Sequence, residues 1–197
     1  MSAVVSSLPG YAELHCRSNH SFGLGASHPE ELIGRARALG YSALAITDEA
    51  SLGGVVRAHA EAKRLALPLI VGAEMRLRRG ADEPPSLHLV VLAMSRRGYG
   101  NLSQWITVAR RRAPKGQYVA LMADVEGKVP NTPTLAGLPD CLALLLPPLE
   151  FEAAFAQAVW LRTWFGDRAA LALPLLHRAH DAVRIETTQR VAALTGL

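Results

Sequence analysis

The chain has 197 residues, half of them hydrophobic, with a formal net charge of +4, which is enough material for one sizeable core and predicts a single domain. No run reaches the about 18 to 20 uncharged apolar residues of a membrane span, so membrane partners are not expected. The two cysteines, Cys16 and Cys141, are far apart and lack CxxC partners, which excludes a zinc ribbon and favours buried thiols in a reducing cytoplasm.

Apolar segments with strand-like and helix-like patterns alternate along the first part of the chain. The predicted elements are a strand at 11–16, a helix ending at Gly40, a strand at 44–47, a helix at 55–65 and a strand at 69–77. Ser27 fits the N-cap of the first helix, and Glu30, three residues later, completes a capping box. This alternation is typical of an α/β fold.

The second part of the chain continues the same alternation. It predicts a strand at 87–94, a helix at 99–112, a Pro/Gly-rich loop at 127–139, a strand at 141–146, a helix at 150–165, a strand at 169–173 and a helix at 181–194. Near-continuous apolar strands separated by helices predict a parallel sheet covered by helices. Because the chain ends on a helix, we expect a barrel that lacks its closing strand and belongs to a larger protein.

Basic residues concentrate between Arg76 and Lys115, where nine Lys or Arg stand against two Asp or Glu. The densest group is Arg110, Arg111, Arg112 and Lys115. Such an excess suits a nucleic acid or an acidic partner. An ordinary solvated surface is the open alternative.

Three apolar, strand-like runs end in residues that are able to bind a metal or transfer protons. These residues are His15, the pair Asp48–Glu49, and Glu74. The carboxyl ends of successive parallel strands converge on one face of a β/α barrel, so one site is expected to contain these residues. A neutral imidazole and carboxylates are suitable ligands for Mg, Mn or Zn. His88 lies at the start of its predicted strand, and we therefore expect it on the opposite, stabilising face.

Arg17 argues against a working metal centre. Alternate strand residues point the same way, so the position two residues after His15 is where a second imidazole ligand is expected. An arginine cannot be deprotonated, cannot ligate a metal and repels a dication at short range. We favour an ion pair of Arg17 with Glu49 or Glu74; metal ligation by His15, Glu49 and Glu74 is the open alternative.

Three motifs resemble the polymerase and histidinol phosphatase (PHP) family. In that family the first strand ends H-L-H-x-H-S, the second T-D-H, the third G-x-E, and a later strand supplies D-x-H. The matching segments are Leu14-His15-Cys16-Arg17-Ser18, Thr47-Asp48-Glu49 and Gly72-Ala73-Glu74. Arg17 replaces the second His of the ligand pair, and Glu49 replaces the His of the second motif.

Further segments are similar to the PHP domain that begins bacterial C-family DNA polymerases, and to their damage-inducible, error-prone branch. They are the run from His88 to Met94, Gly98-Tyr-Gly-Asn-Leu102, Ser18-Asn-His-Ser-Phe22, Gly25-Ala-Ser-His-Pro-Glu-Glu-Leu32 and Ala109-Arg-Arg-Arg-Ala-Pro-Lys-Gly116. The resemblance covers nearly the whole chain and is looser after Gly127. It implies that residues 1–197 are an N-terminal PHP fragment, with the D-x-H strand beyond Leu197.

The resemblance implies a distorted, seven-stranded type of β/α barrel, truncated before its last strand. It also implies a catalytically inactive domain of an error-prone DNA polymerase that acts in damage-induced mutagenesis and translesion synthesis. His15, Glu49 and Glu74 would then be remnant ligand positions, with no cofactor in this fragment and Mg needed only by the polymerase. The implied partners are DNA, a sliding clamp and other mutagenesis proteins. An active metal-dependent phosphoesterase or 3′–5′ exonuclease, and a DNA- or partner-binding module, are the alternatives.

Overall fold

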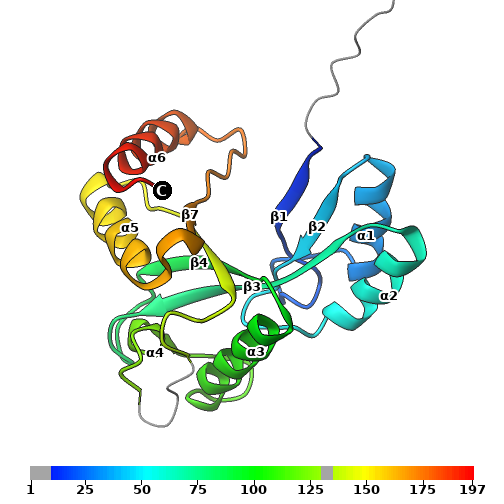
Figure 1. Cartoon of the computed structure of the whole chain (residues 1–197), viewed down its shortest axis with the longest axis horizontal. Helices are drawn as coiled ribbons and strands as arrows, with labels where there is room; N and C mark the ends of the chain where they lie inside the picture. The colour runs from blue at the N-terminus through cyan, green and yellow to red at the C-terminus, as the bar shows by residue number, and fades with distance from the viewer. Residues whose placement is uncertain (1–9, 130–134) are drawn as a thin grey trace, which may run out of the picture.

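The computed structural model describes residues 10–129 and 135–197 (Figure 1). The elements in chain order are β1 (Ala12–Cys16), α1 (Pro29–Ala38), β2 (Ala43–Ile46), α2 (Val55–Leu65), β3 (Leu69–Arg78), β4 (Leu87–Ala93), α3 (Arg96–Arg111), β5 (Ala120–Leu121), α4 (Met122–Val125), β6 (Cys141–Leu145), α5 (Phe151–Phe165), the 3₁₀ turn η2 (Gly166–Arg168), β7 (Ala169–Leu171) and α6 (Asp181–Thr195). Every predicted strand and helix is present, and among the described residues β5, α4 and η2 were not predicted.

Seven strands form one curled, open sheet in the order β1-β2-β3-β4-β6-β7, with β5 beside the end of β3. The predicted all-parallel arrangement is wrong for β4, which runs antiparallel to both β3 and β6. Eight residues connect β3 to β4, whereas a parallel crossover needs about a dozen or more. The short connection therefore forces these two strands to be antiparallel.

The strand β3 belongs to both parts of the sheet. Its first residues, Leu69–Val71, pair with β2 in parallel, and residues 72–77 pair with β4. In Figure 1 this strand crosses the middle of the molecule, with β1, β2, α1 and α2 on one side and the remaining elements on the other. Glu74, within β3, is thereby placed beside residues from both sides.

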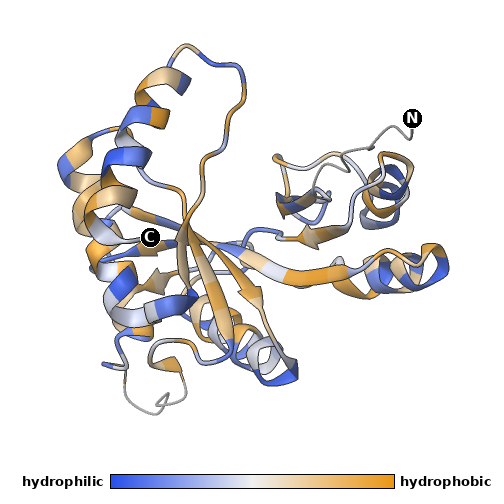
Figure 2. Cartoon of the chain, turned by 45° about the horizontal axis from the view of Figure 1, so that its top comes forward, coloured by the Kyte–Doolittle hydropathy of each residue, from blue (hydrophilic) through white to orange (hydrophobic). Residues whose placement is uncertain are grey.

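Successive side chains of β4 point to opposite faces of the sheet. Leu89 and Val91 join the main core with the helices α3 and α5, whereas Val90 and Leu92 join a smaller cluster on the other face. The hydrophobic strands stand out in Figure 2. His88 lies two residues before Val90, so its side chain points to the same face of the sheet as Val90, which is the face of the smaller cluster. This face carries the site described below.

Two predicted helix starts are corrected. The N-cap of α1 is His28 rather than Ser27, and the carboxylate that accepts from the N-cap N–H is that of Glu31, at 2.8 Å, rather than Glu30. Likewise α3 begins at Arg96 instead of Tyr99, because the Ser95 hydroxyl accepts from the N–H of Gly98 at 3.1 Å. Both differences concern helix ends. A sequence pattern locates the end of a helix less precisely than the helix itself.

The segment predicted as a Pro/Gly-rich loop, 127–139, includes residues 130–134, which lie outside the described residues. Residues 127–129 and 135–139 contain no α-helix or strand. The guanidinium of Arg168 donates to the carbonyls of Gly137 and Leu138 at 2.8 and 2.9 Å, which ties the end of this segment to η2, just before β7. Within the described ranges, every helix is too short or too polar to cross a bilayer.

Candidate functional site

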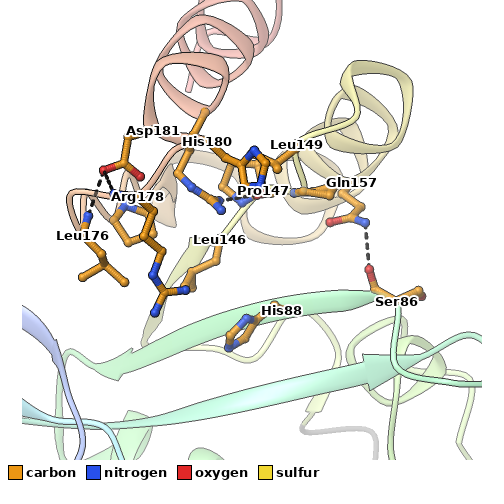
Figure 3. Close-up of a pocket in the computed structure, with 13 residues that line it drawn as sticks. Ser86, His88, Leu146, Pro147, Leu149, Gln157, Leu176, Arg178, His180 and Asp181 are labelled. Atoms are coloured by element: carbon orange, nitrogen blue, oxygen red, sulfur yellow. Dashed lines mark hydrogen bonds between the residues drawn. The ribbon is translucent and has the colours of Figure 1, made fainter.

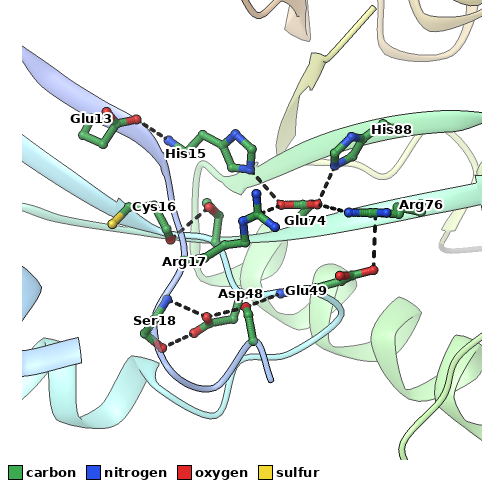
Figure 4. Close-up of polar contacts among 12 residues, drawn as sticks. Glu13, His15, Cys16, Arg17, Ser18, Asp48, Glu49, Glu74, Arg76 and His88 are labelled. Atoms are coloured by element: carbon green, nitrogen blue, oxygen red, sulfur yellow. Dashed lines mark hydrogen bonds and ion pairs between the residues drawn. The ribbon is translucent and has the colours of Figure 1, made fainter. Parts of the chain in front are cut away.

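Glu74 is the centre of a charged cluster inside the curled sheet (Figure 4). Its side chain is fully buried. One carboxylate oxygen, Oε2, accepts from Nε2 of His15 at 2.8 Å and pairs with Nε of Arg17 at 3.2 Å. The other oxygen, Oε1, accepts from Nε2 of His88 at 2.5 Å and lies 3.5 Å from Nη2 of Arg76. Two imidazoles and two guanidinium groups therefore surround one carboxylate.

Strand geometry explains how distant residues meet at Glu74. The pairing of β1 with β2 shifts in register between Glu13 and Cys16, and such irregularities re-aim side chains near functional sites. His15 and Arg17 are two residues apart, and both reach Glu74. His88 reaches it from β4 because antiparallel pairing places the start of β4, at the Arg76–His88 pair, beside the second part of β3.

The predicted position of His88 on the stabilising face is therefore wrong. In an antiparallel strand the amino end lies where a parallel strand would place its carboxyl end, so His88 belongs to the Glu74 cluster. The sequence did carry one signal for this arrangement, which is the eight-residue connection between β3 and β4.

The cluster keeps Glu74 ionised. Burial by itself raises the pKa of this carboxyl, but the hydrogen bonds from His15 and His88 and the electrostatic attraction of His88 and Arg17 outweigh burial. The net result is a pKa well below the ordinary value of a glutamate. At neutral pH Glu74 therefore carries a negative charge, which lies beside the guanidinium groups of Arg17 and Arg76.

The neighbouring carboxylates Asp48 and Glu49 have separate environments, as expected for adjacent residues that point in opposite directions. Asp48 is buried and accepts from the backbone N–H and the hydroxyl of Ser18 and from the hydroxyl of Ser21, at 2.7 to 2.8 Å. Glu49 instead accepts from the hydroxyl of Tyr118 at 2.9 Å and lies 3.5 Å from Nε of Arg76. Asp48 anchors the loop after β1, and Glu49 faces the charged cluster.

The predicted ion pair of Arg17 is present, and its partner is Glu74 rather than Glu49. Of the three remnant positions, His15 and Glu74 are in direct contact, and Glu49 is linked to them through Arg76, which lies 3.5 Å from both glutamates. The structure thus brings the predicted site residues together and adds His88 and Arg76 to them.

These residues, as arranged, do not fit a divalent metal ion. Carboxylate and imidazole ligands must offer free lone pairs to the ion, yet both oxygens of Glu74 already accept from nitrogen donors, and His15 and His88 bond to opposite oxygens. The guanidinium of Arg17, 3.2 Å from one oxygen, adds a fixed positive charge that repels a dication. What the arrangement does is neutralise a buried charge and connect β1, β3 and β4.

A cavity of about 510 Å³ adjoins the cluster at His88 (Figure 3). Its walls are the start of β4, the segment after β6 and the segment before α6. Asp181 fixes the last of these, because its carboxylate accepts from the backbone N–H groups of Leu176 and Arg178, each at 3.1 Å. Arg184 donates to the carbonyl of Pro147 at 3.2 Å and joins the two walls.

The four basic residues predicted to contact nucleic acid are in different environments. Arg110 donates from Nε to the carbonyl of Ala50 at 3.1 Å, and Arg112 donates to both carboxylate oxygens of the buried Asp124. Arg111 and Lys115 are exposed. Arg112 therefore has a structural role as the partner of Asp124, whereas Arg111 and Lys115 are open to solvent.

Comparison with known proteins agrees with this architecture. The model of the PHP domain family matches residues 13–173. A protein named error-prone DNA polymerase from Bordetella parapertussis is 52% identical over 199 residues, covering 100% of this chain and 18% of that protein. Another of that name from Ralstonia nicotianae is 50% identical over 180 residues, covering 90% of this chain and 17% of that protein. The chain thus spans less than a fifth of these relatives, and the predicted likeness to error-prone polymerases is confirmed.

Two solved structures share the fold at low sequence identity. One is a candidate metal-dependent phosphoesterase from Bifidobacterium adolescentis, with a TM-score of 0.62, 16% identity and coverage of 95% of this chain and 85% of that one. The other is an amidohydrolase from Chromobacterium violaceum, with a TM-score of 0.63, 18% identity and coverage of 95% and 84%. These similarities confirm the predicted barrel-type fold alone. The match of the family model over residues 13–173 shows that this chain belongs to the PHP domain family.

Proposed function

We propose that the chain is the PHP domain of an error-prone DNA polymerase and has no hydrolytic activity of its own. The observation that carries this proposal is the pairing of Arg17 with Glu74 at the position where a metal ligand is expected. In this proposal the domain supports a polymerase that acts in the cytoplasm, in damage-induced mutagenesis and translesion synthesis. The polymerase would use Mg at sites outside this chain and would work with DNA, a sliding clamp and other mutagenesis proteins.

The chemistry of arginine supports the proposal. A guanidinium stays protonated at any physiological pH and so compensates the Glu74 charge permanently. Arg76 lies 3.5 Å from the second oxygen and adds to this compensation. A cluster neutralised in this way has no electrostatic need for a bound dication, and no coordinated water is then available as a nucleophile.

Metal titration tests the absence of a metal site. We expect Mn²⁺ or Zn²⁺ to leave the melting temperature of the chain unchanged. A site filled at about 1,000 times its dissociation constant would add about 4 kcal/mol, which raises the Tm of a domain of this size by about 8–16 °C. Thermal melts with and without EDTA measure the effect. A rise of several degrees that EDTA removes would contradict the proposal.

Hydrolysis assays separate the proposal from its main alternative, an active phosphoesterase or 3′–5′ exonuclease. We expect no Mn²⁺-dependent release of phosphate from a phosphate monoester and no shortening of a 3′ end by the chain. Arg17→His alone should not restore either activity, because Arg76 still contacts Glu74 and Glu49 still replaces the second-motif His. Hydrolysis by the natural chain that His15→Ala abolishes would establish the alternative instead.

A further inference from the structure

A second cleft, of about 580 Å³, lies beside the charged cluster and opens to solvent. It is formed by the loop after β1, the segment after β2, the end of β3 and the segment that follows α3. Its lining residues are His20, Ser21, Phe22, Leu24, Glu49, Ser51, Arg76, Arg78, Pro85, Arg110, Gly116, Gln117 and Tyr118. The volume falls within the range of about 300–1,000 Å³ of sites that enclose small ligands.

The cleft is positively charged. Three guanidinium groups, those of Arg76, Arg78 and Arg110, line it together with the single carboxylate of Glu49. Glu49 is already engaged by the hydroxyl of Tyr118 at 2.9 Å. Arg110 is held in place by the carbonyls of Glu49 and Ala50, at 3.3 and 3.1 Å. A cation fixed before binding loses less side-chain entropy when an anion arrives.

At the edge of the cleft, Phe22 is 94% exposed. The loop that carries it is nevertheless firmly built. The hydroxyls of Ser18 and Ser21 both bond to the buried Asp48, and the N–H groups of Leu24 and Gly25 donate to the carbonyl of Ser21, each at 3.0 Å. The ring is therefore presented to solvent by an ordered turn.

Gly25 shows how closely this turn is closed. A Cβ atom at this position would lie 1.9 Å from the carbonyl oxygen of Ser18, so only glycine permits the approach. An ordered turn that exposes a large aromatic ring beside guanidinium groups matches the surfaces that bind single strands, which combine a cationic groove with stacking platforms.

We propose that this cleft binds single-stranded DNA, with a base stacked on Phe22 and the adjoining phosphates beside Arg76, Arg78 and Arg110. An unpaired base offers the free face that stacking requires, whereas a duplex hides it. The choice of DNA over other single-stranded polyanions rests on the proposed function. Lys115 directly precedes Gly116 in the cleft wall, so part of the basic group predicted from sequence adjoins this site.

The binding test uses the 197-residue chain and a fluorescein-labelled oligo(dT), with anisotropy measured over a series of salt concentrations. Each phosphate neutralised on a single strand contributes about −0.7 to the slope of log K against log salt. Contacts to three cations therefore predict a slope of about −2. Arg78→Gln should reduce the steepness by about 0.7, whereas Arg37→Gln, an exposed arginine of α1 outside the cleft, should leave it unchanged.

Phe22→Ala should weaken oligo(dT) binding about 5- to 150-fold, the value of one base–aromatic stack. Phe22→Tyr keeps an aromatic face and should bind like the natural chain. Val56→Ala, which removes an exposed apolar side chain of α2, is the matched control and should have no effect. Because Phe22 is almost fully exposed, thermal melts of its variants should match that of the natural chain.

Three outcomes would overturn the proposal. These are no binding of oligo(dT) at low salt, equal binding by the natural chain and Phe22→Ala, or equal affinity for duplex and single strand. In the first case the exposed ring would instead belong to a protein contact. The metal titration and the phosphate-release assay do not require DNA binding, so loss of the DNA proposal leaves the proposed function standing. Failure of the proposed function would show in those assays, and the anisotropy measurement would still report separately whether the cleft binds a single strand.

Discussion

Replacing Glu74 by alanine is expected to destabilise the chain by about 3–5 kcal/mol, the cost of removing one partner from a buried charge cluster. Glu74 is fully buried, and its loss leaves the imidazoles of His15 and His88 and the guanidinium of Arg17 without their shared acceptor. For a domain of this size the melting temperature should fall by about 6–20 °C. Urea unfolding at neutral pH measures the change in free energy directly.

The pH dependence gives this prediction a second test. The pKa of Glu74 is lowered in the folded chain, so its contribution to stability is fully present above the unfolded value of about 4.3. That contribution is lost as the pH falls through the lowered, folded pKa. The stability difference between the natural chain and Glu74→Gln should therefore be constant near neutrality and shrink below about pH 4.

Glu61→Gln is the matched control for the Glu74 variants. Glu61 pairs with Arg64 on the outer surface of α2, where solvent screens the interaction. Its substitution should leave the unfolding midpoint at neutral pH where it is. A Glu74→Gln difference that stays level or grows under acidic conditions would show that the carboxylate does not hold the cluster together.

Asp124→Ala is expected to have an effect of similar size, about 3–5 kcal/mol. The buried carboxylate of Asp124 accepts two bonds from Arg112, one from the indole N–H of Trp105 and one from the N–H of Leu121. Truncation leaves the indole N–H of the fully buried Trp105 without its acceptor, and it leaves the guanidinium of Arg112 with the carbonyl of Val119, at 3.2 Å, in place of a carboxylate. Urea unfolding followed by tryptophan fluorescence measures the loss.

A double-mutant cycle identifies the origin of the Asp124 effect. If Arg112 is the main partner, Arg112→Met combined with Asp124→Ala should cost less than the two single changes added together. Asp167→Ala removes a fully exposed carboxylate 3.7 Å from Arg162 and should leave stability unchanged. A loss of under about 1 kcal/mol for Asp124→Ala would contradict the proposed structural role.

The succession of the longer strands and helices was predictable because each of them has an apolar run or a helical repeat of its own. The direction of β4 was not, since an apolar strand has the same pattern in parallel and antiparallel sheets. Only the short connection after Arg78 distinguishes the two. The wrong direction predicted for β4 placed His88 on the wrong face of the fold. An error in topology thus led to an error in the predicted site.

The site was partly predictable for the same physical reasons. Arg17 and Glu74 follow from the rule that carboxyl ends of neighbouring strands converge, and their ion pair is confirmed. The pairing of Arg112 with Asp124 was out of reach, because the four residues of α4 are too few to show a helical repeat. A basic run in sequence therefore failed to distinguish Arg112, which is half-buried and bonded to Asp124, from its exposed neighbours.

Strand β3, which pairs with both parts of the sheet, has a consequence for how the domain unfolds. Because the same ten residues bond to β2 at one end and to β4 at the other, the two groups of elements can separate only if β3 loses its ladder with one of them. Amide protons of Val71 and Gly72, at the junction, should exchange with deuterium only when the whole domain opens. A protease cut in the chain near this junction should accordingly yield no stably folded piece.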